Sequence, residues 1–122
     1  MKKIYLASPY SHPVKAVCND RFRAVCKAAA NLMQDGYNVM SPIAHSHPIA
    51  QYTENHLDHD FWLNQDLSFL DSWADEMWVL MIDGWDESKG IAAEIMHADK
   101  IGLPVKHILE IDLSVKYIFM RD

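Results

Sequence analysis

The amino-acid sequence predicts an α/β fold in which a mainly parallel sheet of four or five strands carries helices on both faces. Short apolar runs of strand length alternate with amphipathic segments of helical length along the 122 residues. This alternation favours parallel strands joined by crossover helices. A chain of this length, half of it hydrophobic, is expected to form a single domain over residues 1–122.

The first half of the chain predicts a strand, a loop, a helix and a second strand. Residues 4–7 form a short apolar run, and the segment after it is too rich in proline to begin a helix. Apolar residues at helical spacing predict a helix over residues 14–35, which Gly36 ends. Residues 37–43 are expected to form the second strand, and residues 49–59 a lid or short helix.

The second half predicts a helix over residues 61–73 and a buried strand over residues 77–82. A polar turn follows, and then a helix whose N-cap is Ser88 and whose end is Gly102. Its apolar face is expected to comprise Ile91, Ala92, Ile95 and Ala98. Residues 105–111 are expected to form a fourth strand, and the last ten residues fit either a strand or a helix.

Composition restricts the classes of function. The formal net charge of -6 and the lack of a Lys/Arg stripe argue against binding of a nucleic-acid polymer. A small anion is compatible, because helix N-termini and backbone amides can bind one. No segment reads as a membrane span or a signal peptide, so a cytoplasmic protein without membrane contact is expected. Cys18 and Cys26 lie two helical turns apart and are expected to be reduced.

Two acidic residues interrupt the apolar faces of predicted helices. Asp66 has leucines three residues before it and four after it, and Glu94 has Ile91 and Ala98 at the same spacings. One such carboxylate is common at the border of an amphipathic helix, but two on neighbouring helices favour a functional pair. Partly buried carboxylates suit glycosyl chemistry, in which one attacks or stabilises an oxocarbenium-like carbon and the other assists proton transfer.

Two loops that follow predicted strands carry candidate ligand-binding residues. The first loop offers hydroxyls and an aromatic ring suited to a sugar, phosphate or base, on Ser8, Tyr10 and Ser11. The second combines a helix N-terminus with a hydroxyl, a lysine and a tryptophan that can stack on a ring; its candidates are Asp83, Trp85, Asp86, Ser88, Lys89 and Gly90. Turn formation, helix capping and ordinary loop composition are the alternative explanations.

Histidines gather between residues 45 and 59, with acidic residues among them. A zinc or iron site is conceivable, but the segment contains no His-x-x-x-His pair and no nearby cysteine. We therefore predict no metal site. A histidine-bearing loop over a base-binding pocket, with His47 as the candidate residue, and a merely polar surface loop are the two alternatives.

The segments IYLASPYS, NQDLSFLDSWADEMWVL and DESKGIAAEIMHADKIGLPV together resemble the nucleoside 2-deoxyribosyltransferase superfamily. The similarity is greatest to its 2′-deoxynucleoside 5′-phosphate N-hydrolase branch and to small uncharacterised bacterial or phage relatives. It covers most of residues 4–110, and the Ser-x-Gly-x-x-x-Glu element is its most specific part. The resemblance implies a flavodoxin-like or Rossmann-like three-layer sandwich, a homodimer or homotetramer, and cleavage of an N-glycosidic bond without metal or cofactor.

The same resemblance implies roles for individual residues. Glu94 matches the nucleophile that attacks the anomeric carbon, and Asp66 matches a second acid that assists at the base or orients the nucleophile. Tyr5 matches the tyrosine at the end of the first strand, so these three form the expected catalytic set. Ser88 stands where the phosphate-specific branch holds the 5′-phosphate, whereas the transferases have an aspartate there that binds the 5′-hydroxyl.

The first loop departs from the hydrolase branch, which has a Gly-Ser pair and a basic residue there. Ser8, Ser11 or Lys89 would have to substitute for them. The resemblance thus implies cleavage of a (deoxy)nucleoside 5′-monophosphate or related nucleotide through a glutamyl glycosyl-enzyme intermediate. A nucleoside deoxyribosyltransferase and a non-catalytic protein that binds or senses a nucleotide are the alternatives.

Overall fold

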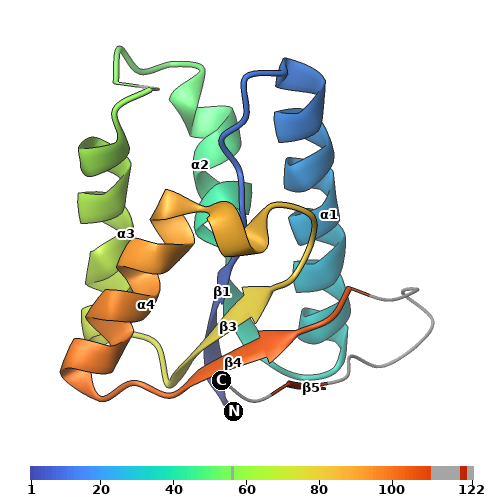
Figure 1. Cartoon of the computed structure of the whole chain (residues 1–122). Coiled ribbons are helices and arrows are strands. Elements are labelled where there is room, and N and C mark those ends of the chain that lie inside the picture. The colour runs from blue at the N-terminus through green and yellow to red at the C-terminus, as the bar shows by residue number, and fades with distance from the viewer. Residues whose placement is uncertain (56, 111–118, 121–122) are drawn as a thin grey trace.

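The computed structural model describes residues 1–55, 57–110 and 119–120, and it has the expected three layers (Figure 1). The strand order in its sheet is β2-β1-β3-β4-β5. The four parallel strands are β1 (Lys3–Ala7), β2 (Asn38–Met40), β3 (Glu76–Leu80) and β4 (Val105–Ile108), and β5 (Phe119–Met120) runs antiparallel to β4. The predicted α/β fold with a mainly parallel sheet is therefore confirmed.

The helices cover both faces of this sheet. They are α1 (Lys15–Gln34), α2 (Pro42–Ala50), α3 (His59–Ser72) and α4 (Lys89–Ile101), with the 3-10 turn η1 (Trp85–Glu87) before α4. Figure 1 shows α3 and α4 together on one side of the strands and α1 on the other. Helix α2 packs against α1 and β1. In the described part of the chain, no helix has the length and apolar character that crossing a bilayer requires.

Alternate residues of the central strands supply the two cores, because successive side chains of a strand point to opposite faces. Ile4 and Leu6 of β1 pack with the α1 side chains Val25, Ala28, Ala29 and Leu32. Tyr5 and Ala7 of the same strand face the other way, into a cluster with Leu70, Ile91 and Ala98 from α3 and α4. This alternation points Tyr5 toward the two helices that carry the candidate acids.

The segment after β2 is helical where the sequence analysis predicted strand. The strand expected over residues 37–43 ends at Met40, and α2 begins at Pro42. Ser41 is its N-cap, with the side-chain oxygen accepting a hydrogen bond from the backbone N–H of Ala44 at 3.1 Å. Proline fits the first position of a helix because no N–H partner is needed there. The strand prediction was wrong because it relied on the apolar residues and did not take Ser41 and Pro42 as the start of a helix.

Two smaller expectations also need correction. Ala92 is exposed, whereas Ile91 and Ala98 are buried and Ile95 is half-buried, so the apolar face of α4 is narrower than expected. Strand β4 ends at Ile108, and residues 111–118 lie outside the described part of the chain. The helices expected over residues 14–35 and 61–73 are confirmed within two residues at each end.

A buried glutamate at the amino end of β3 has its charge fully compensated. Oε2 of Glu76 lies 2.7 Å from Nζ of Lys2, and Oε1 lies 3.1 Å from Nζ of Lys106. Nε1 of Trp78 donates a further hydrogen bond to Oε1 at 2.8 Å. Burial alone would raise the pKa of Glu76, but the hydrogen bonds from these three residues lower it to about 2.

We predict that Glu76→Gln lowers the free energy of unfolding by about 2 kcal/mol at neutral pH, because it removes the charge that the lysines compensate. The folded-state pKa lies below the ordinary value of about 4.3. The ionised group therefore stabilises the fold above that pH, and the stabilisation is lost as the pH falls toward 2. Urea unfolding of both proteins at neutral pH and near pH 3 measures the effect. The exposed Glu87 provides the control variant Glu87→Gln, and a difference between wild type and Glu76→Gln that is independent of pH would contradict the prediction.

Candidate active site

Glu94 of α4 and Tyr5 of β1 form the centre of the candidate site. Ser88 begins α4 by accepting a hydrogen bond from the N–H of Ile91 at 3.2 Å, which confirms it as the N-cap. One turn further along the helix, Glu94 faces the sheet and is only 5% exposed. The hydroxyl of Tyr5, itself fully buried, donates a hydrogen bond to Oε2 of Glu94. The carboxyl group is thus held by one donor inside the interface between helix and sheet.

Burial shifts the acid–base properties of all three residues predicted as catalytic. Burial raises the pKa of Glu94, the hydrogen bond from Tyr5 lowers it and Asp66 raises it, so that together they bring it to about 8. Burial also raises the pKa of Asp66, on α3, to about 7. The pKa of Tyr5 is raised well above its ordinary value by burial and then by the two acids, so Tyr5 stays a hydrogen-bond donor. Because Asp66 acts electrostatically on both Tyr5 and Glu94, and Tyr5 is hydrogen-bonded to Glu94, the structure brings these three residues together.

Asp66 also lines a cavity of about 250 Å³ between α2 and α3. This volume is below the roughly 300–1,000 Å³ typical of pockets for drug-sized ligands. Rings, hydroxyls and an amide form the walls, a combination that suits a planar heterocycle. The lining residues are His45, Ser46, Ile49, Thr53, Phe61, Trp62, Gln65, Asp66 and Phe69.

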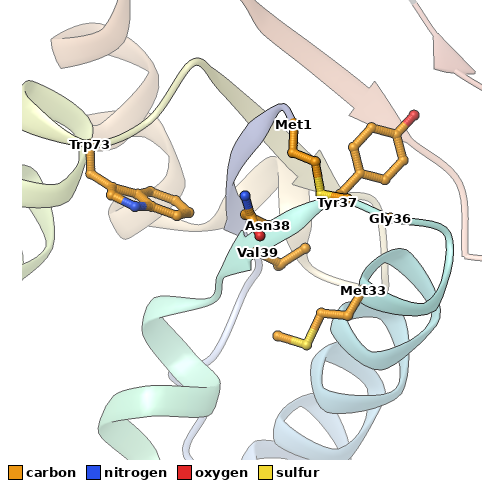
Figure 2. Close-up of a pocket in the computed structure, with 7 residues that line it drawn as sticks. All are labelled: Met1, Met33, Gly36, Tyr37, Asn38, Val39 and Trp73. Atoms are coloured by element: carbon orange, nitrogen blue, oxygen red, sulfur yellow. The ribbon is translucent and has the colours of Figure 1, made fainter.

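A larger hollow of about 600 Å³ lies at the opposite end of the sheet, where the strands begin (Figure 2). Its lining residues are Met1, Met33, Gly36, Tyr37, Asn38, Val39 and Trp73. None of these seven side chains is a carboxylate or a histidine, so the hollow offers little for proton transfer. The site with perturbed carboxyl groups lies near the carboxyl ends of the strands, where open α/β sheets bind ligands.

The first loop meets α2 through Tyr10 and His47. The hydroxyl of Tyr10 lies 2.6 Å from Nδ1 of His47, and Phe22 of α1 stacks on the imidazole with 4.0 Å between ring centroids. Burial, and then the charge of Lys15, lowers the pKa of His47. Ser8 is buried, and its Oγ has no hydrogen-bond partner among the residues that the structure describes. The structure therefore brings Tyr10 and His47 together with Phe22, which the sequence analysis did not expect at the site, and Ser8 lies two residues before Tyr10 in the chain.

The β3–α4 loop brings fewer of the expected residues together. Trp85 is half-buried, packs with the core on the α4 face and contacts the ring of His107 edge-on at 5.1 Å. Packing explains this placement, and stacking of the Trp85 ring on a ligand stays a prediction. Asp83, Asp86 and Lys89 are exposed, and Gly90 is half-buried.

The histidine segment contributes to the cavity. His45 lies on its wall, with its ring 6.4 Å from that of Phe69. Over residues 1–55, 57–110 and 119–120, no three side chains of His, Cys, Asp or Glu gather as a metal site would require. His45 and His47 both lie in helix α2, where they have different surroundings: His45 lines the cavity, whereas His47 contacts Tyr10 and Phe22.

The sequence analysis missed Arg21, which lies between the two loops. Its Nη1 donates hydrogen bonds to the backbone oxygens of Ser11 at 3.0 Å and Tyr10 at 3.5 Å. Arg21 precedes the buried Val25 by four residues and therefore extends the inward stripe of α1. The same spacing identified Asp66 and Glu94, so the signal was available in the sequence.

The fold and the comparisons with known proteins place the chain in the nucleoside 2-deoxyribosyltransferase-like group, and the resemblance seen in the sequence is confirmed. Within that group the chain belongs to the family described as "Domain of unknown function (DUF1937)", whose model matches residues 2–110. The structure is similar to that of a 2-deoxyribosyltransferase from the psychrotolerant bacterium Bacillus psychrosaccharolyticus. The TM-score is 0.64 at 28% identity, over 92% of this chain and 78% of that chain. The comparison with curated proteins finds no match.

We predict that Glu94→Gln stabilises the fold by about 2 kcal/mol at neutral pH. The folded-state pKa of Glu94, about 8, exceeds the ordinary value of about 4.3. Between these values the unfolded chain loses a proton that the folded chain retains, so this group destabilises the fold increasingly as the pH rises. Glutamine removes that penalty, and the gain should vanish near pH 4, where both states are protonated.

Urea unfolding at the two pH values measures the difference. The control is Asp99→Asn, which changes an exposed acid on the same helix and should show no comparable gain. A Glu94→Gln protein less stable than wild type at neutral pH would contradict the assignment of Glu94 as a destabilising buried acid.

Proposed function

We propose that this protein cleaves the N-glycosidic bond of a (deoxy)nucleoside 5′-monophosphate or a related nucleotide. The observation that carries the proposal is the buried carboxyl group of Glu94, which accepts a hydrogen bond from Tyr5 and interacts electrostatically with Asp66. Pairs of acids with perturbed pKa values are typical of sites for general acid and nucleophilic catalysis. The similarity to a 2-deoxyribosyltransferase supports glycosyl transfer as the class of reaction.

In the first step, Glu94 acts as the nucleophile. The carboxylate oxygen that Tyr5 does not contact bonds to the anomeric carbon while the bond from that carbon to the base nitrogen breaks. The electron pair of the broken bond passes to the base, which takes a proton from Asp66. The hydrogen bond from Tyr5 orients the attacking carboxylate and favours its ionised form.

In the second step, water resolves the glycosyl–enzyme intermediate. Asp66, now a carboxylate, accepts a proton from a water molecule whose oxygen bonds to the anomeric carbon. The bond between that carbon and Glu94 breaks, which restores both residues to their starting protonation states. The products are the free base and the sugar phosphate.

The cavity between α2 and α3 supports a location for the base. Asp66 lies in its wall, and aromatic residues such as Phe61 and Phe69 line it. A base bound there would have its leaving nitrogen near the acid that protonates it. Ser88 is a candidate to bind the phosphate at the other end of the substrate. Its side-chain oxygen accepts the capping hydrogen bond of α4, and its O–H group can still donate to a phosphate.

The similarity to a 2-deoxyribosyltransferase also favours a second candidate, in which another base replaces water in the second step. The two reactions share the intermediate on Glu94 and differ in the acceptor. Adding an excess of a different free base distinguishes them. A new nucleoside or nucleotide indicates transfer, whereas sugar phosphate as the sole sugar product indicates hydrolysis.

We predict that the wild-type protein releases free base from a nucleoside monophosphate and that Glu94→Ala slows the release by at least about a thousandfold, because no nucleophile remains. Chromatography of reactions with the common deoxynucleosides and their 5′-monophosphates measures the release. Asp99→Asn should retain wild-type activity. Thermal stabilisation by nucleotides without base release from any of them would instead favour the non-catalytic binding protein.

We also predict a bell-shaped dependence of kcat/KM on pH, with a maximum between about 7 and about 8, the pKa values of Asp66 and Glu94. The active form carries one proton on the pair. At lower pH both groups are protonated and the nucleophile is lost, whereas at higher pH both are ionised and no acid remains for the base. Initial rates of base release over a range of pH give the profile. A rate that continues to rise well above pH 8 would contradict the role of a shared proton.

A further inference from the structure

Arg21 places a guanidinium group between the two loops that flank the candidate site. Its Nη1 is hydrogen-bonded to the backbone oxygens of Tyr10 and Ser11 in the β1–α1 loop. Its Nη2 lies against the β3–α4 loop, since a Cβ atom built on Gly84 would be 2.3 Å from that nitrogen. Strands β1 and β3 are neighbours, so Arg21 holds a positive charge at the carboxyl edge of the sheet.

This charge has no acidic partner in the described part of the chain, where no carboxylate lies within 4.0 Å of Arg21. Arg23, two residues along α1, differs in both respects: it is exposed, and its Nη1 lies 2.9 Å from Oδ1 of Asp20. The N–H groups of Arg21 beyond those of Nη1 also have no acceptor among the described residues. A half-buried cation with unused donors and no counter-ion favours an anionic ligand.

Other groups of the β1–α1 loop and of the start of α1 would favour the same ligand. Ser8, at the start of the β1–α1 loop, is 5% exposed, and its Oγ has no partner among the described residues. Helix α1 begins at Lys15 with no acidic residue in its first turn, and its N-cap residue, Val14, makes no side-chain capping hydrogen bond. An unpaired hydroxyl, a lysine and an uncapped helix start all attract phosphate oxygens.

We propose that Arg21 binds the phosphate group of the substrate and makes the protein selective for nucleotides over nucleosides. The inference rests on the proposed N-glycosidase function and names the residue that distinguishes the two classes of substrate. A guanidinium group donates several hydrogen bonds to the oxygens of one phosphate, and the charges compensate each other. The hydroxyl of an unphosphorylated sugar supplies neither the charge nor as many acceptor oxygens.

The test compares base release from deoxynucleoside 5′-monophosphates and from the matching deoxynucleosides. Arg21→Met should lower kcat/KM for the monophosphates by about ten- to a hundredfold, since a hydrogen-bonded charge pair is lost. Its activity on nucleosides should change by less than about twofold, well under the effect of such a pair. Arg23→Met is the matched control and should leave both activities unchanged. An equal loss on both classes would overturn the proposal, because it would show that Arg21 only joins the two loops.

A binding measurement separates this inference from the proposed catalysis. In calorimetric titrations, the Glu94→Gln protein should bind a monophosphate about ten- to a hundredfold more tightly than its nucleoside, and Arg21→Met in that background should abolish the preference. If the wild type releases no base but this preference is found, the proposed function fails and the role of Arg21 stands. If the wild type releases base and Arg21→Met leaves the preference for the monophosphate unchanged, the proposed function stands and the role of Arg21 fails.

A third variant covers the case in which Arg21→Met does not fold, as judged by circular dichroism. Arg21→Lys keeps the charge but has a single nitrogen in place of the guanidinium fork. It should fold and show a reduced preference for the monophosphate over the nucleoside. A preference equal to that of the wild type would overturn the proposal.

Discussion

Placing the carboxyl group of Glu94 between a helix and the centre of a parallel sheet costs free energy, because burial opposes its ionisation. The rest of the site depends on the interactions that keep this carboxyl group in place despite that cost. Ile91 and Ala98, one turn to either side, bury enough apolar surface to hold α4 against the sheet, and the Ser88 cap fixes where the helix begins. Tyr5 then supplies a single donor to the acid. The result is a carboxyl group that is positioned rigidly and only partly stabilised as an anion, as a nucleophile requires.

Asp66 gives this arrangement its chemistry. Glu94 is buried, Asp66 is half-buried, and Asp66 raises the pKa of Glu94. Two acids that interact in this way do not ionise independently, so the loss of a proton from one opposes its loss from the other. With pKa values of about 7 and about 8, the pair retains a proton near neutral pH, when one member must attack and the other must donate. Asp66 lines the cavity, so a base bound there would lie next to Asp66 and could accept its proton.

Much of this site could be predicted because helical spacing records which face of a helix is inward. That rule identified Glu94 and Asp66 and would have identified Arg21, which precedes Val25 by one turn, had it been applied to cations as well as acids. The role of Tyr5 was predicted from the resemblance to a family. The sequence pattern alone would have assigned a tyrosine in a buried strand to the hydrophobic core. Contacts between distant segments could not be predicted: Tyr10 and His47 are far apart in the chain, and the cavity exists only once α2 and α3 have packed. The strand expected through residue 43 failed because Ser41 and Pro42 form a helix start.

The two ends of the sheet differ in whether their charged side chains form ion pairs. Where the strands begin, Glu76 is surrounded by two lysines and an indole N–H, and its pKa falls to about 2; such compensation stabilises a fold and leaves no group available for reaction. Where the strands end, Glu94 and Asp66 lie near each other without a cation in ion-pair contact, and Arg21 lies without an acid, among the residues described. Opposite charges left unpaired at one edge of a small sheet are better explained by a bound partner than by stability, because the chain could have neutralised them as it does Glu76. A nucleotide has complementary groups for both: a base that takes a proton and a phosphate that accepts from a guanidinium.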